Sequence, residues 1–340
     1  MRLRANAVWT SLIAIVLLAL PWLLPAAKLN ISLGTTVLLF ALAASSVNIL
    51  LGYTGLMAFG NAAFFGVGAY ASALFAIHTV PSLLPAVAVG SIAGMLSAML
   101  VGPFLIRRRG IYFSLLTIAF GQVYYFVAYR WNDMTGGEDG LTVQRPPLAA
   151  AKGVDDAQFY FFALAIFALF MVVLWYVLRS PFGLTLRAIG QNEVRARYLG
   201  IDTNRFVYFA LTLSGLFAGT AGALYSMSIN FAYPLLMDWH QSGDFVMMVV
   251  LGGTGTLWGP LVGATIYALG ANVLSSATEA WQIAIGALFV ACVLLFPRGL
   301  LGLGSRSGGA APQSLAMEAG AEPVALAAQG YEPVAQRDLG

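Results

Sequence analysis

The chain has 340 residues, of which 60% are hydrophobic and only 9% carry an acidic or basic side chain. Together with a mean hydropathy of +0.83, this composition excludes an ordinary water-soluble domain. The net charge of +3 comes almost wholly from arginines that cluster in a few connectors. Such clustering indicates membrane orientation rather than nucleic-acid binding. We therefore predict an all-α polytopic membrane protein whose surroundings are membrane lipid.

Nine apolar segments follow one another along the chain, and most reach the length of about 20 residues that spans a bilayer. They lie at 7–27, 31–51, 57–78, 83–106, 111–131, 159–178, 206–229, 244–275 and 282–297. The first could be a cleaved signal peptide, but it exceeds the roughly 7–15 apolar residues of such a signal. We expect nine or ten membrane segments in one domain over residues 1–304. The Ala-, Gly- and Pro-rich tail 305–340 is expected to be disordered.

The arginine-rich connectors predict the orientation of the chain. The positive-inside rule places four of them in the cytoplasm: Arg2 with Arg4, 107–109, 179–205, and Arg298 with Arg306. Both termini are then cytoplasmic, and the loop 132–158 lies on the opposite, periplasmic side. Returning the chain to the cytoplasm after residue 243 requires an odd number of crossings. That count favours a break in the segment 244–275, because Gly- and Pro-rich backbone is tolerated at membrane depth beside protein or a water-filled cavity.

Two glycine motifs suggest a translocation pathway. Gly-x-Thr-Gly at 52–55 has a counterpart at 252–255, and paired Gly-interrupted segments in two halves of a chain point to a transporter's binding region. The alternative is packing, because small residues let helices approach closely in any membrane protein. The predicted pathway residues are Gly52, Thr54, Gly55, Asn61, Gly252, Gly253, Thr254, Gly255, Gly259 and Pro260.

The connector 179–205 holds five arginines, each costing roughly 2.5–3.5 kcal/mol at the centre of a bilayer, so it must lie in water or against protein. Val194, Tyr198 and Ile201 share one face of a helix. Gly190 and Gly200 bracket that stretch, and Asp202 is placed to cap the next span. We predict a short amphipathic helix, parallel to the membrane, that fits a groove in a partner. The alternative is an ordinary positive-inside loop.

The stretch GQNEVRARYLGID, from Gly190 to Asp202, resembles the coupling loop of the LivM-type permease subunits of branched-chain amino acid ABC importers. The stretches GYTGLMAFGNAAFFGVGAY, MTGGEDGL, VVLGGTGTLWGPLVGA and FPRGLLGL agree with it, so the resemblance covers roughly residues 30–304. It implies half of a translocation pathway for branched-chain or related amino acids in a bacterial inner membrane. By the resemblance, the residues that couple to an ATPase are Ala188, Gly190, Gln191, Asn192, Glu193, Arg195, Ala196, Gly200, Ile201 and Asp202.

The resemblance also implies partners: a second, LivH-type permease, two cytoplasmic ATPase subunits that bind ATP and Mg, and a periplasmic substrate-binding protein. The chain itself has no G-x-x-x-x-G-K-[ST] loop for ATP, so we expect no cofactor here and no enzymatic activity. We also expect no metal site, because His78 and His240 lack a surrounding cluster of ligands. The acids Glu138, Asp139, Asp155 and Asp156 form a docking face for the binding protein or simply a solvated loop.

Three other functions stay open at this point. An ion-coupled secondary transporter usually places ionisable groups within its spans, and the predicted spans here are nearly empty of them. A permease of the same importer group could carry urea, amides or sugars. A membrane scaffold would transport nothing.

Overall fold

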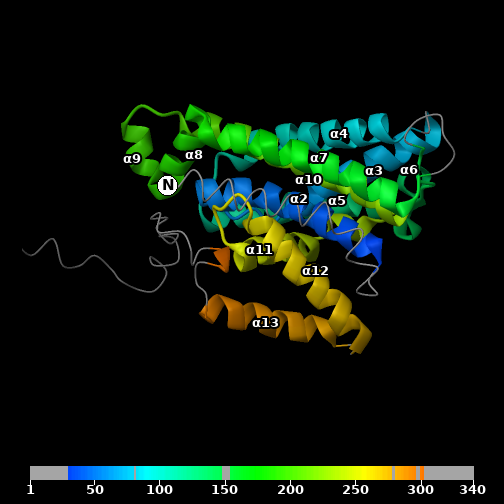
Figure 1. Ribbon diagram of the computed structural model, residues 1–340. Helices are drawn as coiled ribbons and strands as arrows, with labels where there is room; N and C mark the ends of the chain where they lie inside the picture. The colour runs from blue at the N-terminus through cyan, green and yellow to red at the C-terminus, as the bar shows by residue number, and fades with distance from the viewer. Residues whose placement is uncertain (1–29, 80–81, 148–153, 278–279, 296–298, 302–340) are drawn as a thin grey trace, which may run out of the picture.

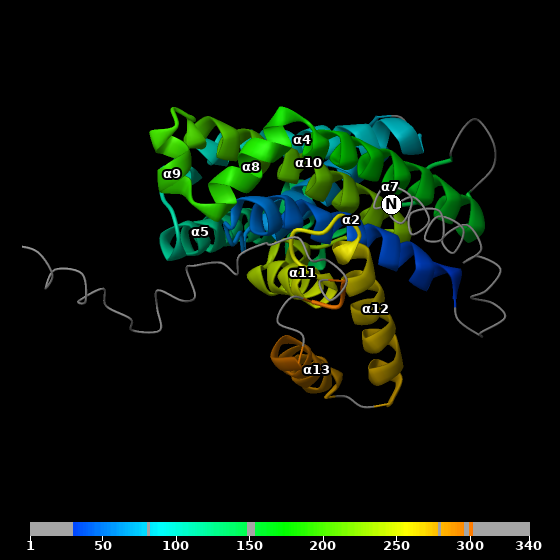
Figure 2. The ribbon, with the colours of Figure 1, turned by 60° about the vertical axis from the view of Figure 1, so that its left-hand side comes forward.

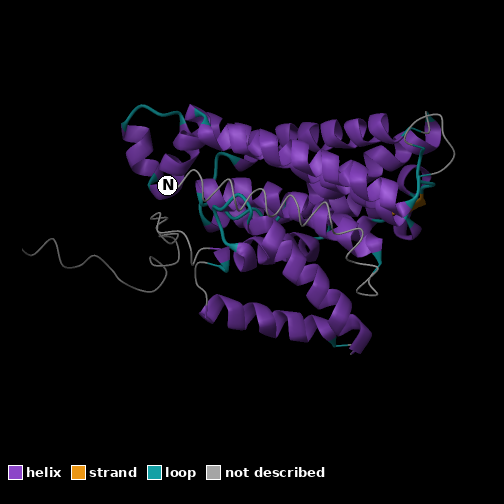
Figure 3. Cartoon of the chain, in the orientation of Figure 1, coloured by secondary structure: helices purple, strands orange, loops and turns teal. Residues whose placement is uncertain are grey.

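The computed structural model describes residues 30–79, 82–147, 154–277, 280–295 and 299–301. The predicted span 7–27 and the tail 305–340 lie outside these residues. In the described part of the chain, six helices are long and apolar enough to cross a membrane. They are α2 (Ile31–Thr54), α3 (Asn61–His78), α4 (Leu83–Leu105), α5 (Ile111–Arg130), α7 (Asp156–Arg179) and α10 (Thr203–Ile229). Figure 3 shows helices as nearly all of the regular structure in the described chain. These observations confirm an all-α polytopic membrane protein.

Shorter elements complete the described chain. The helices are α6 (Asn132–Thr135), α8 (Pro181–Gln191), α9 (Glu193–Tyr198), α11 (Trp239–Gly252), α12 (Gly259–Ala277) and α13 (Trp281–Leu295), with 3-10 turns at Gly137–Asp139 and Pro234–Met237. Strands β1 (Leu141–Thr142) and β2 (Phe231–Ala232) pair antiparallel. Figure 1 shows α8 and α9 at one end of the helical bundle and α6 at the opposite end. Figures 1 and 2 both show α12 leaving the bundle toward α13.

The centre of the bundle is formed by α2 and α10. Within their most apolar windows, 83% of α2 and 72% of α10 is buried, whereas the corresponding share of α5 is 22%. Glycines let α10 approach its neighbours: a Cβ at Gly68 of α3 or Gly94 of α4 would overlap the backbone of Gly219. At these positions small residues act in packing, as they do in many membrane helices.

Each glycine motif lies where one helix ends and the next has not yet begun. The predicted segment 57–78 is wrong at its start: α2 ends at Thr54, α3 begins only at Asn61, and residues 55–60 are not helical. The cause is Gly55, whose φ of 72° ends the helix in a left-handed conformation. The predicted break near 252–260 is confirmed, because α11 ends at Gly252 and α12 begins at Gly259. Gly253 and Gly255 both have positive φ, a conformation that favours glycine.

Candidate functional site

The segment between α7 and α10 contains two short helices. Pro181 occupies the first turn of α8, where its missing N–H is not needed. The chain becomes extended at Asn192, whose side-chain oxygen accepts a hydrogen bond from the backbone nitrogen of Arg195 at 2.8 Å and so caps α9. Asp202 caps α10 in the same way, accepting from the nitrogen of Arg205 at 3.3 Å. The prediction that Asp202 caps the next span is therefore confirmed.

The structure has a short helix, α9, between Gly190 and Gly200, but it does not confirm a single amphipathic helix that carries Val194, Tyr198 and Ile201 on one face. Gly190 lies in the last turn of α8, and Ile201 lies beyond the end of α9. The cap at Asn192 divides the helix, because its side chain satisfies a backbone N–H that a continuous helix would bond internally. Val194 and Tyr198 are 62% and 88% exposed, so they project away from this chain.

The ten predicted coupling residues are spread over the two helices and the turns that follow them. Ala188, Gly190 and Gln191 end α8; Asn192 is the break; Glu193, Arg195 and Ala196 form α9; and Gly200, Ile201 and Asp202 lead into α10. We call this stretch, residues 188–202, the coupling segment.

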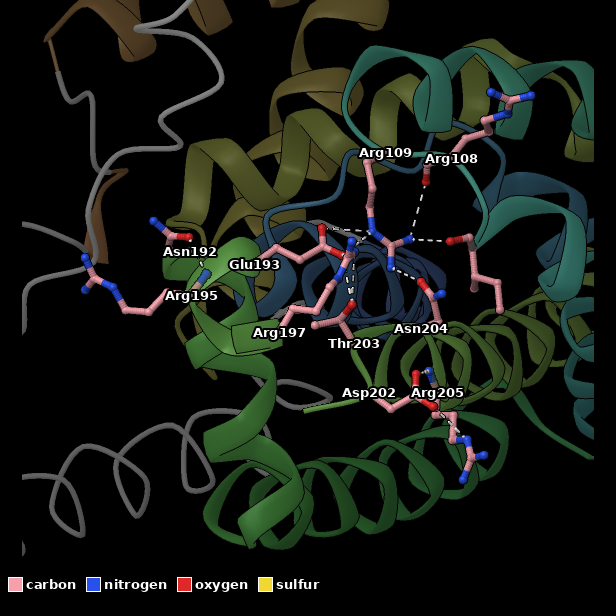
Figure 4. Close-up of polar contacts among 11 residues, drawn as sticks. Arg108, Arg109, Asn192, Glu193, Arg195, Arg197, Asp202, Thr203, Asn204 and Arg205 are labelled. Carbon is pink, nitrogen blue, oxygen red and sulfur yellow. Dashed lines mark hydrogen bonds and ion pairs between the residues drawn. The ribbon is translucent and has the colours of Figure 1, made fainter. Parts of the chain in front are cut away.

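Glu193 is the electrostatic centre of the coupling segment (Figure 4). Its two carboxylate oxygens accept from Nε of Arg109 at 2.8 and 2.9 Å. Oε1 also accepts from Nη2 of Arg197 at 2.9 Å and from the hydroxyl of Thr203 at 3.0 Å. Burial alone would raise the pKa of Glu193, but the hydrogen bonds and charges of these partners outweigh it and lower the pKa. Glu193 is therefore held ionised between three elements.

The coupling segment lies against the end of α2. A Cβ at Gly190 would approach the carbonyl oxygen of Tyr53 to 2.6 Å, so only glycine fits without displacement. The guanidinium of Arg187 lies 5.5 Å from the centre of the Tyr53 ring, a cation–π distance. These contacts place the coupling segment directly on the helix end that precedes the first glycine break.

The two glycine breaks contact each other through Asn48, a residue that the sequence analysis did not select. Its side-chain nitrogen donates to the carbonyl oxygen of Thr256 at 2.8 Å, and its Oδ1 accepts from the backbone nitrogen of Gly255 at 2.9 Å. Gly52 permits this approach, since a Cβ there would overlap Gly255. The one signal in the sequence was a polar amide within an apolar run, one turn before the motif 52–55.

The other predicted pathway residues lie in different surroundings. Gly252, Gly253, Gly259 and Pro260 form the tight turn of the second break, where a Cβ at Gly252 would overlap the carbonyl of Gly259. Thr54 bonds within its own helix, to the carbonyl of Leu50 at 2.7 Å, and Thr254 is exposed. The structure therefore joins Gly52 to Gly255 but leaves Thr54 and Thr254 outside that contact.

Asn61 belongs to a separate buried cluster. Its side-chain nitrogen donates to the hydroxyls of Ser46 at 3.1 Å and Ser214 at 2.8 Å. Both hydroxyls give their own protons to backbone carbonyls, which fixes the orientation of the amide. The Oδ1 of Asn61 is left buried with no partner among the residues that the structure describes. Asn61, Thr117 and Tyr124 line a small pocket between α3, α4, α5 and α10.

The four acids predicted to dock a binding protein lie at the opposite end of the bundle, and two of them contact other side chains of this chain. Glu138 accepts from the hydroxyl of Tyr129 at 2.9 Å, and Asp156 pairs with Arg145 at 2.8 Å. Asp139 and Asp155 are exposed. Half of the predicted docking face is thus engaged within the chain.

The six long apolar helices of the described residues define a polytopic membrane protein, and a glycine-rich break such as the one between α11 and α12 points to the binding region of a transporter. The chain belongs to the family of permease components of the branched-chain amino acid transport system, whose family model matches residues 30–295. Members of this family are transport subunits and not enzymes.

Individual relatives agree with this family. The chain is 26% identical to the high-affinity branched-chain amino acid transport system permease protein LivM of Escherichia coli K12, over 85% of this chain and 74% of that protein. It is 24% identical to LivM of Salmonella typhimurium over the same shares. The ribose import permease protein RbsC of Bacillus subtilis is 31% identical over 40% of this chain and 46% of its own length. No solved structure matches the chain significantly.

Proposed function

We propose that the chain is a LivM-type permease subunit of an ABC importer and forms half of the pathway for branched-chain or related amino acids in a bacterial inner membrane. The observation that carries this proposal is the family match over residues 30–295. The coupling segment supports it, because the cap of α9 and the ion pair between Glu193 and Arg109 hold a charged helix in place at one end of the bundle.

The proposed partners follow from the two ends of the bundle. The importer has two ATPase subunits, which bind ATP and Mg, and one of them contacts the coupling segment from the cytoplasm, where the exposed Val194 and Tyr198 project from α9. A periplasmic binding protein delivers the solute at the other end, near Asp139 and Asp155. A LivH-type permease supplies the second half of the pathway. In this orientation both termini are cytoplasmic.

Coupling would proceed through contacts within this chain. Closure of the ATPases displaces the coupling segment, and the contact of Gly190 with Tyr53 passes that displacement to the end of α2. Asn48 and Gly52 then carry it to Gly255 in the second break. Tightly packed elements of this kind move as rigid bodies between discrete states. The two glycine breaks would move together.

The first test isolates the chain with whatever binds it, identifies the partners by mass spectrometry and measures ATP hydrolysis. Two ATPases and a second permease are expected, and ATP-driven uptake should follow when the complex and its binding protein are combined with liposomes. A lone oligomer without ATP hydrolysis, or uptake driven by an ion gradient without ATPases, would overturn the importer proposal in favour of a secondary transporter.

The second test removes the coupling contact. Glu193→Ala combined with Gly200→Val breaks the ion pair with Arg109 and forces a branched residue into a φ of 82°. Uptake per ATP hydrolysed should fall sharply. Gly243→Ala is the matched control, because no atom lies within 4 Å of a Cβ at that position. Normal coupled uptake in the double variant would contradict the lever role of the coupling segment.

A sugar is the second candidate solute, favoured by the 31% identity to a ribose import permease. The two candidates differ in the companion binding protein, and solute binding by that protein separates them. Leucine or valine binding supports the amino acid proposal, and pentose binding supports the alternative.

A further inference from the structure

Arg109 contacts three elements of the chain, whereas the positive-inside rule requires only that its charge lie in the cytoplasm. Besides Glu193, its guanidinium donates from Nη1 to the carbonyl oxygen of Ile106 at 2.7 Å and from Nη2 to the side-chain oxygen of Asn204 at 2.7 Å (Figure 4). It thereby joins the end of α4, the start of α9 and the first turn of α10. Arg107 and Arg108, its neighbours, are exposed and suffice for a positive-inside loop.

The connection is stiff. The planar fork of an arginine directs its N–H groups along fixed lines. The single Nε–H group of Arg109 donates to both carboxylate oxygens of Glu193. The side chains of Arg109 and Glu193 are each 23% exposed, so water competes less for this pair than for a surface ion pair. A displacement of α9 therefore displaces the loop that carries Arg109.

That loop leads directly into α5, which begins at Ile111. Of the six long apolar helices in the described ranges, α5 has the smallest buried share, 22%. An element with few buried contacts has little packing to rebuild when it moves. Among the long helices described, α5 therefore has the least packing within this chain, and its polar contacts help to fix its position.

Two polar contacts of α5 run to the first glycine break. The hydroxyl of Ser114 donates to the carbonyl oxygen of Met57 at 2.8 Å, and the backbone nitrogen of Phe59 donates to the hydroxyl of Thr117 at 3.1 Å. Gly60 lies so close to α5 that a Cβ there would overlap the carbonyl of Thr117. One end of α5 is thus connected to the coupling segment through Arg109. The side of α5 contacts the non-helical residues 55–60.

We propose that Arg109 transmits the displacement of the coupling segment to α5, and that α5 moves against residues 55–60 during the transport cycle. Arg109 is a positioning residue in this scheme: it acts through Glu193 and α5 and need not touch the solute. The inference rests on the proposed importer function. ATP-driven uptake by the unsubstituted complex tests that function separately from Arg109.

The first experiment compares Arg109→Gln with Arg108→Gln in the complete complex, reconstituted with its binding protein. Both variants remove one positive charge from the same loop, but only Arg109 bonds Glu193. The ratio of solute taken up to ATP hydrolysed should fall at least about fivefold in Arg109→Gln, the lower end of typical coupling between sites, and stay unchanged in Arg108→Gln. Equal losses in the two variants would overturn the proposal, because they would show an effect of loop charge alone.

If Arg109→Gln does not assemble, Arg109→Lys and a double variant test the same transmission. Lysine retains the charge but lacks the fork, so the ratio should still fall. Combined with Glu193→Gln, Arg109→Lys should lower the ratio no further than Glu193→Gln alone, because both changes break one connection. Multiplied losses would show independent roles and overturn the transmission through Glu193.

The second experiment locks α5 in place. In a Cys292→Ser background, which removes the single native cysteine, Met57→Cys and Ser114→Cys are joined by a short, cleavable thiol cross-linker. Uptake should be lost on cross-linking and return on cleavage, while each single cysteine variant should show the same uptake before and after treatment with the reagent. Undiminished uptake by the fully cross-linked protein would overturn the movement of α5.

Discussion

Gly255 donates its backbone N–H to the side-chain oxygen of Asn48, a residue 207 positions earlier, at 2.9 Å. The same side chain donates to the carbonyl of Thr256 at 2.8 Å. The break between α11 and α12 frees these two backbone groups from helical bonding, and a buried backbone group left unpaired is costly. Asn48, which is fully buried, therefore stabilises an interrupted helix in the other half of the chain.

Replacing Asn48 with leucine should destabilise the protein. The substitution keeps the approximate size but leaves the N–H of Gly255 and the carbonyl of Thr256 without their partner, at about 1–3 kcal/mol for each buried unsatisfied group. Thermal unfolding of the purified protein in detergent measures the change. Asn272→Leu makes the same exchange on an exposed part of α12 and should leave the midpoint within a degree or two, roughly the scatter of neutral surface changes. Equal midpoints for the two variants would show that the Asn48 bonds do not stabilise the break.

Gly190→Ala should separate the coupling segment from α2. The added methyl group would lie 2.6 Å from the carbonyl oxygen of Tyr53, and overpacking of this kind typically costs about 1–3 kcal/mol. Because the contact lies on the proposed route, uptake by the complex should fall more than ATP hydrolysis. Gly270→Ala, a helical glycine with open space around it, is the control. An unaffected ratio of uptake to hydrolysis in Gly190→Ala would exclude α2 from the route.

The order of the helices could be predicted from the sequence because apolar runs and arginine-rich connectors are local features. The break after Gly252 could also be predicted, since glycines and a proline together disfavour a continuous helix. The length of α9 could not. Hydrophobic spacing favoured one helix through residue 201, whereas the side chain of Asn192 caps a new helix at Glu193.

The contacts that connect the candidate site were beyond sequence analysis for a different reason. Arg109 and Glu193 are 84 positions apart, and nothing local distinguishes Arg109 from its two arginine neighbours. Asn48 likewise carries no local sign of its partner at Gly255. Which polar residue meets which backbone group is decided by the packing of α2 against α11 and α12, and a single sequence does not encode that pairing in any readable pattern.

The stability contributed by Glu193 should depend on pH. Its pKa in the folded protein lies below the ordinary value of 4.5, because the hydrogen bonds and charges of Arg109, Thr203 and Arg197 outweigh the effect of burial. A depressed pKa gives stability that is fully present above the unfolded pKa and is lost as the pH falls through the folded pKa. The difference in unfolding midpoint between the unsubstituted protein and Glu193→Gln should therefore be constant from about pH 6 to pH 8, where the carboxyl is ionised in both states, and shrink as the pH falls below 4.5. The same difference at acid and neutral pH would show that the ion pair does not form.

Arg145 should matter more to the outer loop than its acidic partner Asp156. Its Nε and Nη2 donate to the carbonyls of Met227 and Ser228 in the last turn of α10, at 3.1 and 3.0 Å, where a helix leaves carbonyls without internal partners. The guanidinium also lies 4.5 Å from the centre of the Phe159 ring, and its side chain is 14% exposed. Asp156, by contrast, is 65% exposed, so its loss leaves a pair that water can largely replace.

Arg145→Met should therefore lower the free energy of unfolding by about 2 kcal/mol or more, and Asp156→Asn by less than about 1 kcal/mol. Thermal unfolding in detergent ranks the two variants, and limited proteolysis of the loop 132–158 locates the effect. If Asp156→Asn were the more damaging change, the ion pair would be the main anchor and the carbonyl contacts incidental. The expected ranking instead makes Arg145 the residue that ties the loop to the end of α10.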